Sequence, residues 1–234
     1  MALILCIETG TEVCSVGLVN NGVLISLRES DAGRDHAKKV AVFVDELLKE
    51  NDIQPDQIDA VAVGEGPGSY TGLRIGVSFA KGLCYALGKP LIAVSSLAAL
   101  TAVAIEDYQA GIIDIDNWDK ALLCPMIDAR RMEVYAQVFD NSGKALNDIA
   151  AEVVTESSFE TFRATADQFI IFGNGAAKCC EILGAKYIDI AHSVRGMASI
   201  ANAKFEVNDF VDVAYFEPYY LKDFVVTTSR KKLF

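Results

Sequence analysis

The opening of the chain alternates short apolar runs with turn residues, a pattern typical of β-strands. The run at 3–7 ("LILCI") has no polar interruption, which predicts a fully buried strand. Two further runs, at 13–19 and 23–27, flank the Asn-Asn-Gly segment 20–22, whose residues tolerate positive φ. The pattern predicts three strands, the second and third joined as a hairpin.

The hydrophobic period then changes to that of a helix over about 35–50. The stretch "IDAVAVGEG" at 58–66 predicts another buried strand that ends in glycines, and a helix over about 71–87 follows it. The stretch "PLIAVSSLAAL" at 90–100 predicts a strand leading into a helix capped by Ser95 or Ser96. Three strands followed by helix, strand, helix, strand and helix match a ribonuclease-H-like order, a mixed sheet with helices on both faces.

The second half of the chain repeats this order coarsely, without a residue-level repeat. The polar, acidic stretch "EDYQAGIIDIDNWDK" at 106–120 indicates a boundary or a long connection. Beyond it the pattern predicts strands at about 121–127, 133–140 and 149–154, a helix near Ser158, and a strand, glycine turn and helix in "FIIFGNGAAKCCEIL". We therefore expect an α/β protein of two ribonuclease-H-like subdomains, residues 1–105 and 106–234, with a cleft between them. A helix at about 193–203 is expected to pack back on the first.

Composition and charge argue against a membrane protein, a secreted protein and a protein that binds RNA unaided. Of 234 residues, 52% are hydrophobic, yet no apolar run approaches the roughly 18 residues that span a membrane. The short apolar start has no basic residue before it, unlike a secretion signal, so a soluble cytoplasmic protein is expected. The net charge of −11 argues against unaided RNA binding, because the only basic cluster is 230–232, where a disordered tail is expected.

The chain has few residues suited to a metal site. Its six cysteines form no CxxC pair, and it has only two histidines, so no metal is expected. Most of the cysteines lie among aliphatic residues, as buried reduced thiols do.

The segment "VAVGEGPGSYTGLRIG" at 61–76 resembles a phosphate-holding turn between a strand and a helix. It lacks the lysine of the P-loop motif, and Leu73 and Arg74 follow Gly72 instead. Gly72, Gly76 and Ala80 recur every four residues, so they share one helical face. Because an interior helical glycine costs about 1 kcal/mol against alanine, close approach of another backbone is expected there.

Two readings of this small-residue face remain open: packing within the chain, or contact with a partner. The preceding helix carries "VAVFV" at 40–44, which is apolar all round and suits burial on more than one side. The candidate partner-binding residues are therefore on both helices: His36, Val40, Phe43, Gly72, Gly76 and Ala80.

Five motifs in order resemble one family over nearly the full chain. They are "ILCIETGTEVCSVGL", "GEGPGSYTGLRIG", "KPLIAVSSLAAL", "IDARRMEVYAQVF" and "FEPYYLKDF". The chain resembles the bacterial tRNA threonylcarbamoyladenosine biosynthesis proteins TsaB, formerly YeaZ. The resemblance implies the two-part fold of acetate and sugar kinases, Hsp70 and actin. It also implies a non-catalytic relative of TsaD, the protein that transfers threonylcarbamoyl to tRNA.

The resemblance also indicates which chemistry has been lost. Ser96 and Leu100 stand at the positions of the two metal-binding histidines of TsaD, and neither can replace imidazole. The place of the first phosphate loop is taken by Glu8, Thr9, Gly10 and Thr11, and the backbone N–H groups of residues 9–12 remain suited to a phosphate. In the second loop Asp128 remains, while Arg130 and Arg131 replace glycines and are either surface charges or partner contacts. These five residues, Glu8 to Thr11 and Asp128, are candidates for a vestigial nucleotide site.

Two classes of function follow from the resemblance. In the first, the helices at 35–50 and 71–87 bind TsaD, TsaE and tRNA join the complex, and the same face forms a homodimer when TsaD is absent. No catalytic residue, metal or resident cofactor is expected, and whether ATP or ADP binds at the TsaD interface is left open. The alternative is an enzyme of the same fold, a small-molecule phosphotransferase or a glycoprotease-like metallopeptidase.

Overall fold

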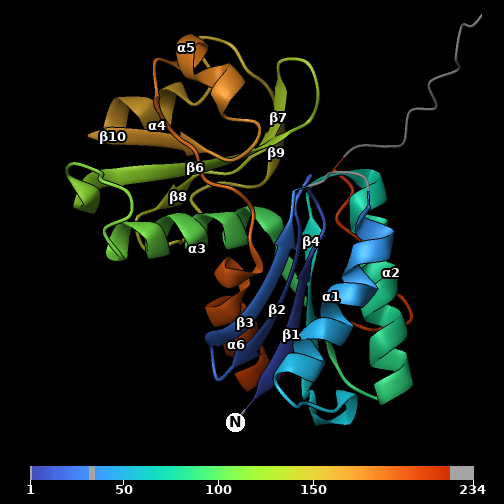
Figure 1. Ribbon diagram of the computed structural model, residues 1–234. Helices are drawn as coiled ribbons and strands as arrows, with labels where there is room; N and C mark the ends of the chain where they lie inside the picture. Colours follow the sequence, from blue (N-terminus) through green and yellow to red (C-terminus); the bar gives the residue numbers. More distant parts are fainter. Residues whose placement is uncertain (1, 32–34, 222–234) are drawn as a thin grey trace, which may run out of the picture.

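The computed structural model describes residues 2–31 and 35–221 and contains two β-sheets, one above the other in Figure 1. The strands of the first sheet lie between residues 3 and 95, and those of the second between 121 and 188. Helices flank both sheets. This arrangement confirms the predicted α/β class with two ribonuclease-H-like halves. The basic cluster at 230–232 lies outside the described residues.

The first sheet contains the five strands predicted for a ribonuclease-H-like half. Its order is β3 (Val23–Ser30), β2 (Cys14–Asn20), β1 (Leu3–Glu8), β4 (Ala60–Gly66) and β5 (Leu91–Ser95). The pairs of β2 with β1 and β3 are antiparallel, and β1, β4 and β5 are parallel. Asn21 and Gly22 have φ values of 49° and 79°, which confirms the predicted hairpin turn.

Both faces of this sheet are covered by helices. Because successive strand residues point to opposite faces, Leu5 and Ile7 pack beneath α1 (His36–Glu50) and α2 (Tyr70–Leu87). Ile4 and Cys6 face α6 (Ala198–Glu206), which contacts β1 and β5. The polypeptide reaches α6 through the 3₁₀ turn Val194–Met197, and another 3₁₀ turn, Pro55–Gln57, precedes β4.

Most strands of the second sheet are shorter than those of the first, and one of them lies off its main strand order. Its order is β11 (Lys186–Ile188), β10 (Gln168–Phe172), β6 (Ala121–Asp128), β7 (Glu133–Ala136) and β9 (Ala150–Val153), and β8 (Phe139–Asp140) also pairs with β6. The short helices are α4 (Glu160–Thr165) and α5 (Cys180–Leu183), with 3₁₀ turns at Trp118–Lys120 and Ala177–Cys179. The strand expected over 133–140 is thus two strands, because Val138 N–H donates to Asn147 Oδ1 instead of continuing the ladder. The side chain of Gln137 also donates to Asn147 O.

Helix α3 (Ser96–Gln109) lies between the two sheets (Figure 1). Its Ala99 packs in the core of the first half, whereas Leu97, Leu100 and Val103 pack in a core shared with the second sheet. The expected boundary at residue 105 falls inside this helix, and its position stays a prediction.

All six cysteines are free thiols, and only Cys180 is not buried. Burial raises the pKa of Cys6 to about 12 and that of Cys14 and Cys84 to about 11, which keeps these thiols protonated. The expected packing role is therefore confirmed. Within the described ranges, none of the helices combines the length and apolar character needed to cross a membrane.

Candidate functional site

The small-residue face of α2 is turned toward the chain's own first loop. A Cβ at Gly72 would overlap the carbonyl oxygen of Thr9, and a Cβ at Gly76 would overlap the Thr9 hydroxyl. Thr9 Oγ1 donates a 2.8 Å hydrogen bond to the Gly72 carbonyl, and Ala80 is fully buried in the core beneath α2. Atoms of the same chain therefore fill the space beside Gly72, Gly76 and Ala80, which supports the reading that this face packs within the chain, and a partner contact at these residues stays a prediction.

The residues predicted on α1 also face inward. His36 and Val40 are buried, and Phe43 is half-buried against the core beneath the helix. The ring Nε2 of His36 lies 2.9 Å from the Thr11 carbonyl oxygen. His36, Val40 and Phe43 therefore lie on the side of α1 that packs against the core, and a partner contact at these residues stays a prediction.

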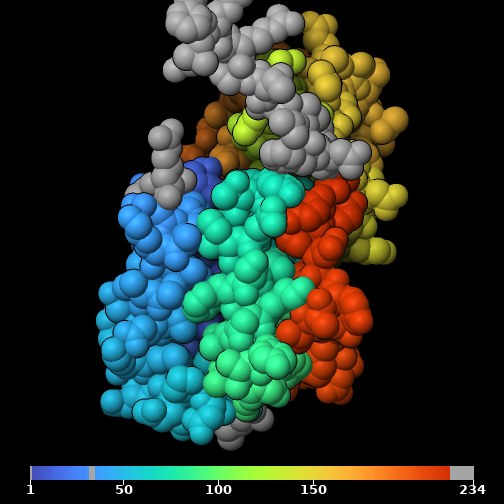
Figure 2. Space-filling view, turned by 90° about the vertical axis from the view of Figure 1, so that its right-hand side faces the viewer, coloured from blue at the N-terminus to red at the C-terminus, as the bar shows by residue number. Residues whose placement is uncertain are grey.

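The outer surface of the two helices is formed by other residues. We call it the outer α1–α2 face and define it by Ala41 and Val42 on α1 and Ser78, Gly82 and Tyr85 on α2, all exposed. Figure 2 shows the two helices side by side on one side of the molecule. Val42 is 50% exposed and Tyr85 is 87% exposed.

Gly82 distinguishes this face. No atom lies within 4 Å of the position that its Cβ would occupy, so packing among the described residues does not require glycine there. A glycine inside a helix costs about 1 kcal/mol against alanine, and close approach of another backbone would explain it. Gly82 can be seen in the sequence too, but the regular spacing of Gly72, Gly76 and Ala80 favoured the other face of the helix.

The segment after α6 runs along α2 and completes this side of the molecule (Figure 2). Val211 N–H donates to Leu91 O at 2.9 Å, and Tyr219 N–H donates to Glu65 O at 2.7 Å. The Lys81 ammonium donates to the carbonyl oxygens of Ala214 and Phe216, at 3.1 and 2.8 Å.

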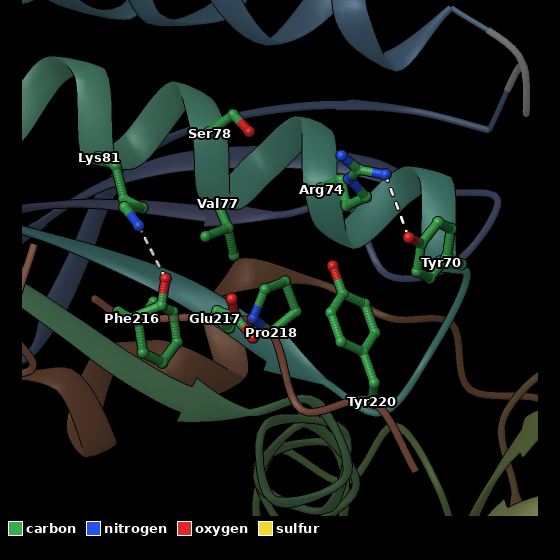
Figure 3. A pocket seen from close by; sticks show the side chains of 9 residues that line it. All are labelled: Tyr70, Arg74, Val77, Ser78, Lys81, Phe216, Glu217, Pro218 and Tyr220. Atoms are coloured by element: carbon green, nitrogen blue, oxygen red, sulfur yellow. Dashed lines mark hydrogen bonds between the residues drawn. The ribbon is translucent and has the colours of Figure 1, made fainter. Parts of the chain in front are cut away.

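A hollow of about 600 Å³ lies between α2 and this segment (Figure 3). The Arg74 guanidinium donates to Tyr70 Oη at 3.1 Å and lies 5.3 Å from the ring centroid. The Tyr70 and Tyr220 rings are 5.0 Å apart. These contacts hold the aromatic residues at the edge of α2, next to the outer α1–α2 face.

The candidate nucleotide loop is occupied by its own glutamate. Glu8 is only 1% exposed. Its Oε1 accepts a 2.7 Å hydrogen bond from Gly10 N–H, and its Oε2 accepts one of 2.7 Å from Ser96 Oγ. Burial raises the pKa of this carboxyl, and the loop hydrogen bonds oppose the shift. The carboxylate is directed into the loop rather than toward solvent.

Asp128 lies at the exposed end of β6, in the second half. It forms an ion pair with Lys178 and accepts from Arg130 N–H at 3.2 Å. Arg130 and Arg131 have φ values of 72° and 53°, so two arginines occupy the left-handed conformation that glycine adopts most easily. The carboxyl groups of Glu8 and Asp128 thus have different bonding partners.

The histidine-equivalent positions do not fit a metal. Ser96 and Leu100 are completely buried, Ser96 bonding to Glu8 and Leu100 packing in the core between the sheets. Residues 2–31 and 35–221 contain no group of three or more His, Cys, Asp or Glu side chains able to hold a metal ion. The remaining histidine, His192, is buried, and burial lowers its pKa to about 4.

Comparison with known proteins adds family relationships to this geometry. The family model of TsaD, tRNA N6-adenosine threonylcarbamoyltransferase, matches residues 29–227. The tRNA threonylcarbamoyladenosine biosynthesis protein TsaB of Haemophilus influenzae is 38% identical over 56% of this chain and 51% of its own length. The TsaB of Bacillus subtilis is 31% identical over 64% of this chain and 60% of its own length. The chain thus spans between half and two thirds of these two relatives.

A longer alignment is found with the TsaB of Escherichia coli, which is 28% identical over 94% of both chains. Among solved structures, a Pseudomonas aeruginosa protein described as similar to peptidase YEAZ superimposes with a TM-score of 0.79 at 27% identity. That match covers 95% of this chain and all of the other. The chain therefore belongs to the TsaD family, and its relatives place it with the TsaB (YeaZ) proteins.

Proposed function

We propose that this chain is a cytoplasmic, non-catalytic subunit of the machinery that forms threonylcarbamoyladenosine in tRNA, where it binds and activates a TsaD-type transferase. Its relatives carry the name of biosynthesis proteins for this modified nucleoside, which supports a role in the pathway. The modified adenosine lies beside the anticodon of tRNAs that read ANN codons. TsaE joins the same assembly.

The observation that carries the proposal is the outer α1–α2 face. Val42 and Tyr85 expose large apolar surface there, and Gly82 leaves the α2 backbone open to close approach. Aromatic residues at the centre of an interface supply much of its binding energy, and Tyr85 follows Gly82 by three residues, about one helical turn. A helix of the transferase packed on this face would bury both features at once.

Charge supports an indirect role toward tRNA. The chain carries 32 acidic and 21 basic residues, for a net charge of −11. Binding to nucleic acid depends largely on cations that neutralise phosphates, so an acidic protein is poorly suited to hold tRNA unaided. In the proposed assembly this chain therefore does not hold the tRNA by itself, and the tRNA binds to the assembled complex.

The enzyme alternative finds no support in the site. A metallopeptidase needs metal ligands, yet Ser96 and Leu100 occupy the histidine positions and are buried. A phosphotransferase needs a carboxylate free to bind magnesium or activate a nucleophile, whereas both oxygens of Glu8 accept internal hydrogen bonds.

The proposal is tested by titrating the TsaD protein of the same organism into Gly82→Arg and measuring Kd calorimetrically. A charged side chain in the middle of the interface is expected to weaken binding by at least about 30-fold. Val153→Arg is the matched control, because Val153 is an exposed apolar residue, 62% exposed, on β9 of the other half. Gly76→Arg is unsuitable, since any side chain there overlaps Thr9.

Equal affinities for wild type, Gly82→Arg and Val153→Arg would show that the outer α1–α2 face is not the contact surface. The same face is proposed to form a homodimer when the transferase is absent, because one apolar surface can serve both contacts. Light scattering of the purified chain is then expected to show a dimer that Gly82→Arg converts to a monomer.

A further inference from the structure

The carboxylate of Glu8 has an environment that proteins commonly build around an anion. Its oxygens accept from the N–H groups of Thr9 and Gly10 and from the hydroxyl of Ser96. Ser96 is the first residue of α3, so the carboxylate lies at the positive end of that helix. Loop N–H groups together with a helix N-terminus form the usual cradle for a phosphate.

The surrounding backbone is shaped to leave room for this side chain. A Cβ at Gly64, on the neighbouring strand β4, would overlap the Glu8 carboxylate, and a Cβ at Gly10 would approach Oε1 to 2.9 Å. On the other side, Gly68 packs directly against the Gly10 backbone, and Gly72 packs against Thr9. Glycines on three sides therefore enclose the carboxylate and its loop.

A nucleotide phosphate, which the fold resemblance implies at this loop, does not fit these residues. The N–H groups of Thr9 and Gly10 that would bind it already bond to Glu8. The turn before α2 closes on the loop, with Ser69 N–H donating to Gly10 O at 2.7 Å. We propose that the carboxyl group of Glu8 replaces the phosphate and holds the loop and α3 in place without a bound nucleotide.

The same loop contacts the second half of the molecule. Two residues beyond Gly10, Glu12 Oε2 accepts a 2.5 Å hydrogen bond from Asn174 Nδ2, and Asn174 Oδ1 accepts from Asp128 N–H at 3.0 Å. Through Ser96, Glu8 also fixes the first turn of α3, whose later residues pack against the second sheet. Glu8 thus orders both connections by which the loop and α3 reach the second half.

Hydrogen exchange of the isolated protein tests this role. In Glu8→Ala, the amides of the 9–12 loop, the first turn of α3 and the 173–176 turn are expected to exchange at least about 10-fold faster than in wild type. Glu181→Ala, an exposed glutamate on α5, is the control and should leave them unchanged. Unchanged exchange in Glu8→Ala would overturn the proposal.

Glu8→Gln separates charge from shape and covers the case in which Glu8→Ala does not fold. The amide keeps an acceptor for Gly10 N–H but carries no charge, so acceleration to a smaller extent is expected. Exchange equal to wild type would show that an anion is not required there.

Nucleotide itself provides the second readout. In amide NMR spectra of the wild-type protein, millimolar Mg·ATP or inorganic pyrophosphate is expected to leave the Thr9 and Gly10 signals unmoved. Saturable shifts of these signals at submillimolar ligand would overturn the proposal. Neither readout involves the transferase. The Glu8 proposal can therefore fail while the proposed function stands, and the proposed function can fail while the Glu8 proposal stands.

Discussion

Glycines that look alike in the sequence have different roles in this molecule. Gly72 and Gly76 allow α2 to approach Thr9, so a methyl group at either position would overlap atoms of the same chain. Gly82, on the outer surface of the same helix, has open space around it. The two kinds of glycine differ in whether they contact the loop at Thr9, which is more than sixty residues away in sequence. Replacement by alanine is therefore expected to have opposite effects on stability at the two kinds of position.

Gly72→Ala is expected to lower the free energy of unfolding by about 1–3 kcal/mol, because the new methyl group overlaps the Thr9 backbone. Gly82→Ala is expected to raise it by up to about 1 kcal/mol, through helix propensity alone. Urea unfolding at one pH measures both values. Effects of equal sign in the two variants would contradict the assignment of the inner and outer faces.

His192 makes stability depend on pH in a defined window. It is 3% exposed, its Nε2 has no hydrogen-bond partner among the described residues, and burial lowers its pKa to about 4 from the 6.5 of an exposed histidine. Between those values the unfolded chain binds a proton that the folded chain does not. The free energy of unfolding therefore falls as pH drops from 6.5 toward 4, by at most about 3 kcal/mol.

Replacing His192 by leucine is expected to remove this loss. The measurement compares urea unfolding of wild type and His192→Leu at pH 7.5 and pH 4.5, and the difference between the two proteins should shrink or reverse at the lower pH. The pH 7.5 data are the control, since His192 is neutral in both states there. A parallel loss in the two proteins would show that the imidazole takes up its proton in the folded chain.

At the scale of elements, the hydrophobic period was sufficient to predict most of the first half. The alternation in 3–27 and the helical period in 35–50 reflect local burial, which the sequence records directly. Strand β11, Lys186–Ile188, was missed because three residues cannot show a period. Strands β7 and β8 were predicted as one because the break depends on Asn147, a residue outside the run.

The candidate site was harder to predict because helix α2 has two small-residue faces. One carries Gly72, Gly76 and Ala80, and the other carries Ser78, Gly82 and Ala86. Both repeat every four residues, so the spacing cannot show which face is turned inward. The inward-facing side of α2 is identified by its contact with Thr9, a residue distant in sequence whose hydroxyl donates to the Gly72 carbonyl.

One lysine of α2 bonds to the segment after α6, whose Val213 and Phe216 also pack against the core beneath the helix. Replacing Lys81 by methionine keeps the length of the side chain and removes the donor to the carbonyls of Ala214 and Phe216. The Tyr219 amide, which donates to Glu65 O, is then expected to exchange about 5–10-fold faster. Lys89→Met, two residues beyond the end of the same helix, is the control. Equal exchange in both variants would show that apolar packing holds the segment without the lysine.

At the scale of the whole molecule, α3 determines whether the two halves unfold together. The helix contributes Ala99 to the core of the first half and Leu97, Leu100 and Val103 to the core shared with the second sheet. The second sheet therefore cannot lose its core without exposing one side of α3, whose first turn is bonded to Glu8 of the first sheet. We expect one cooperative unfolding transition, with equal calorimetric and van't Hoff enthalpies.

Leu100→Ala is expected to lower the stability of both halves together. Leu100 is completely buried, so truncation leaves a cavity and should cost about 2–5 kcal/mol. Leu146→Ala, at a residue that is 41% exposed, is the matched control and should change stability by less than about 0.5 kcal/mol. In scanning calorimetry the variant should melt at a lower temperature in a single peak. Two peaks, with one at the wild-type temperature, would show that the first half folds independently of α3 and that the inter-half contacts add little to its stability.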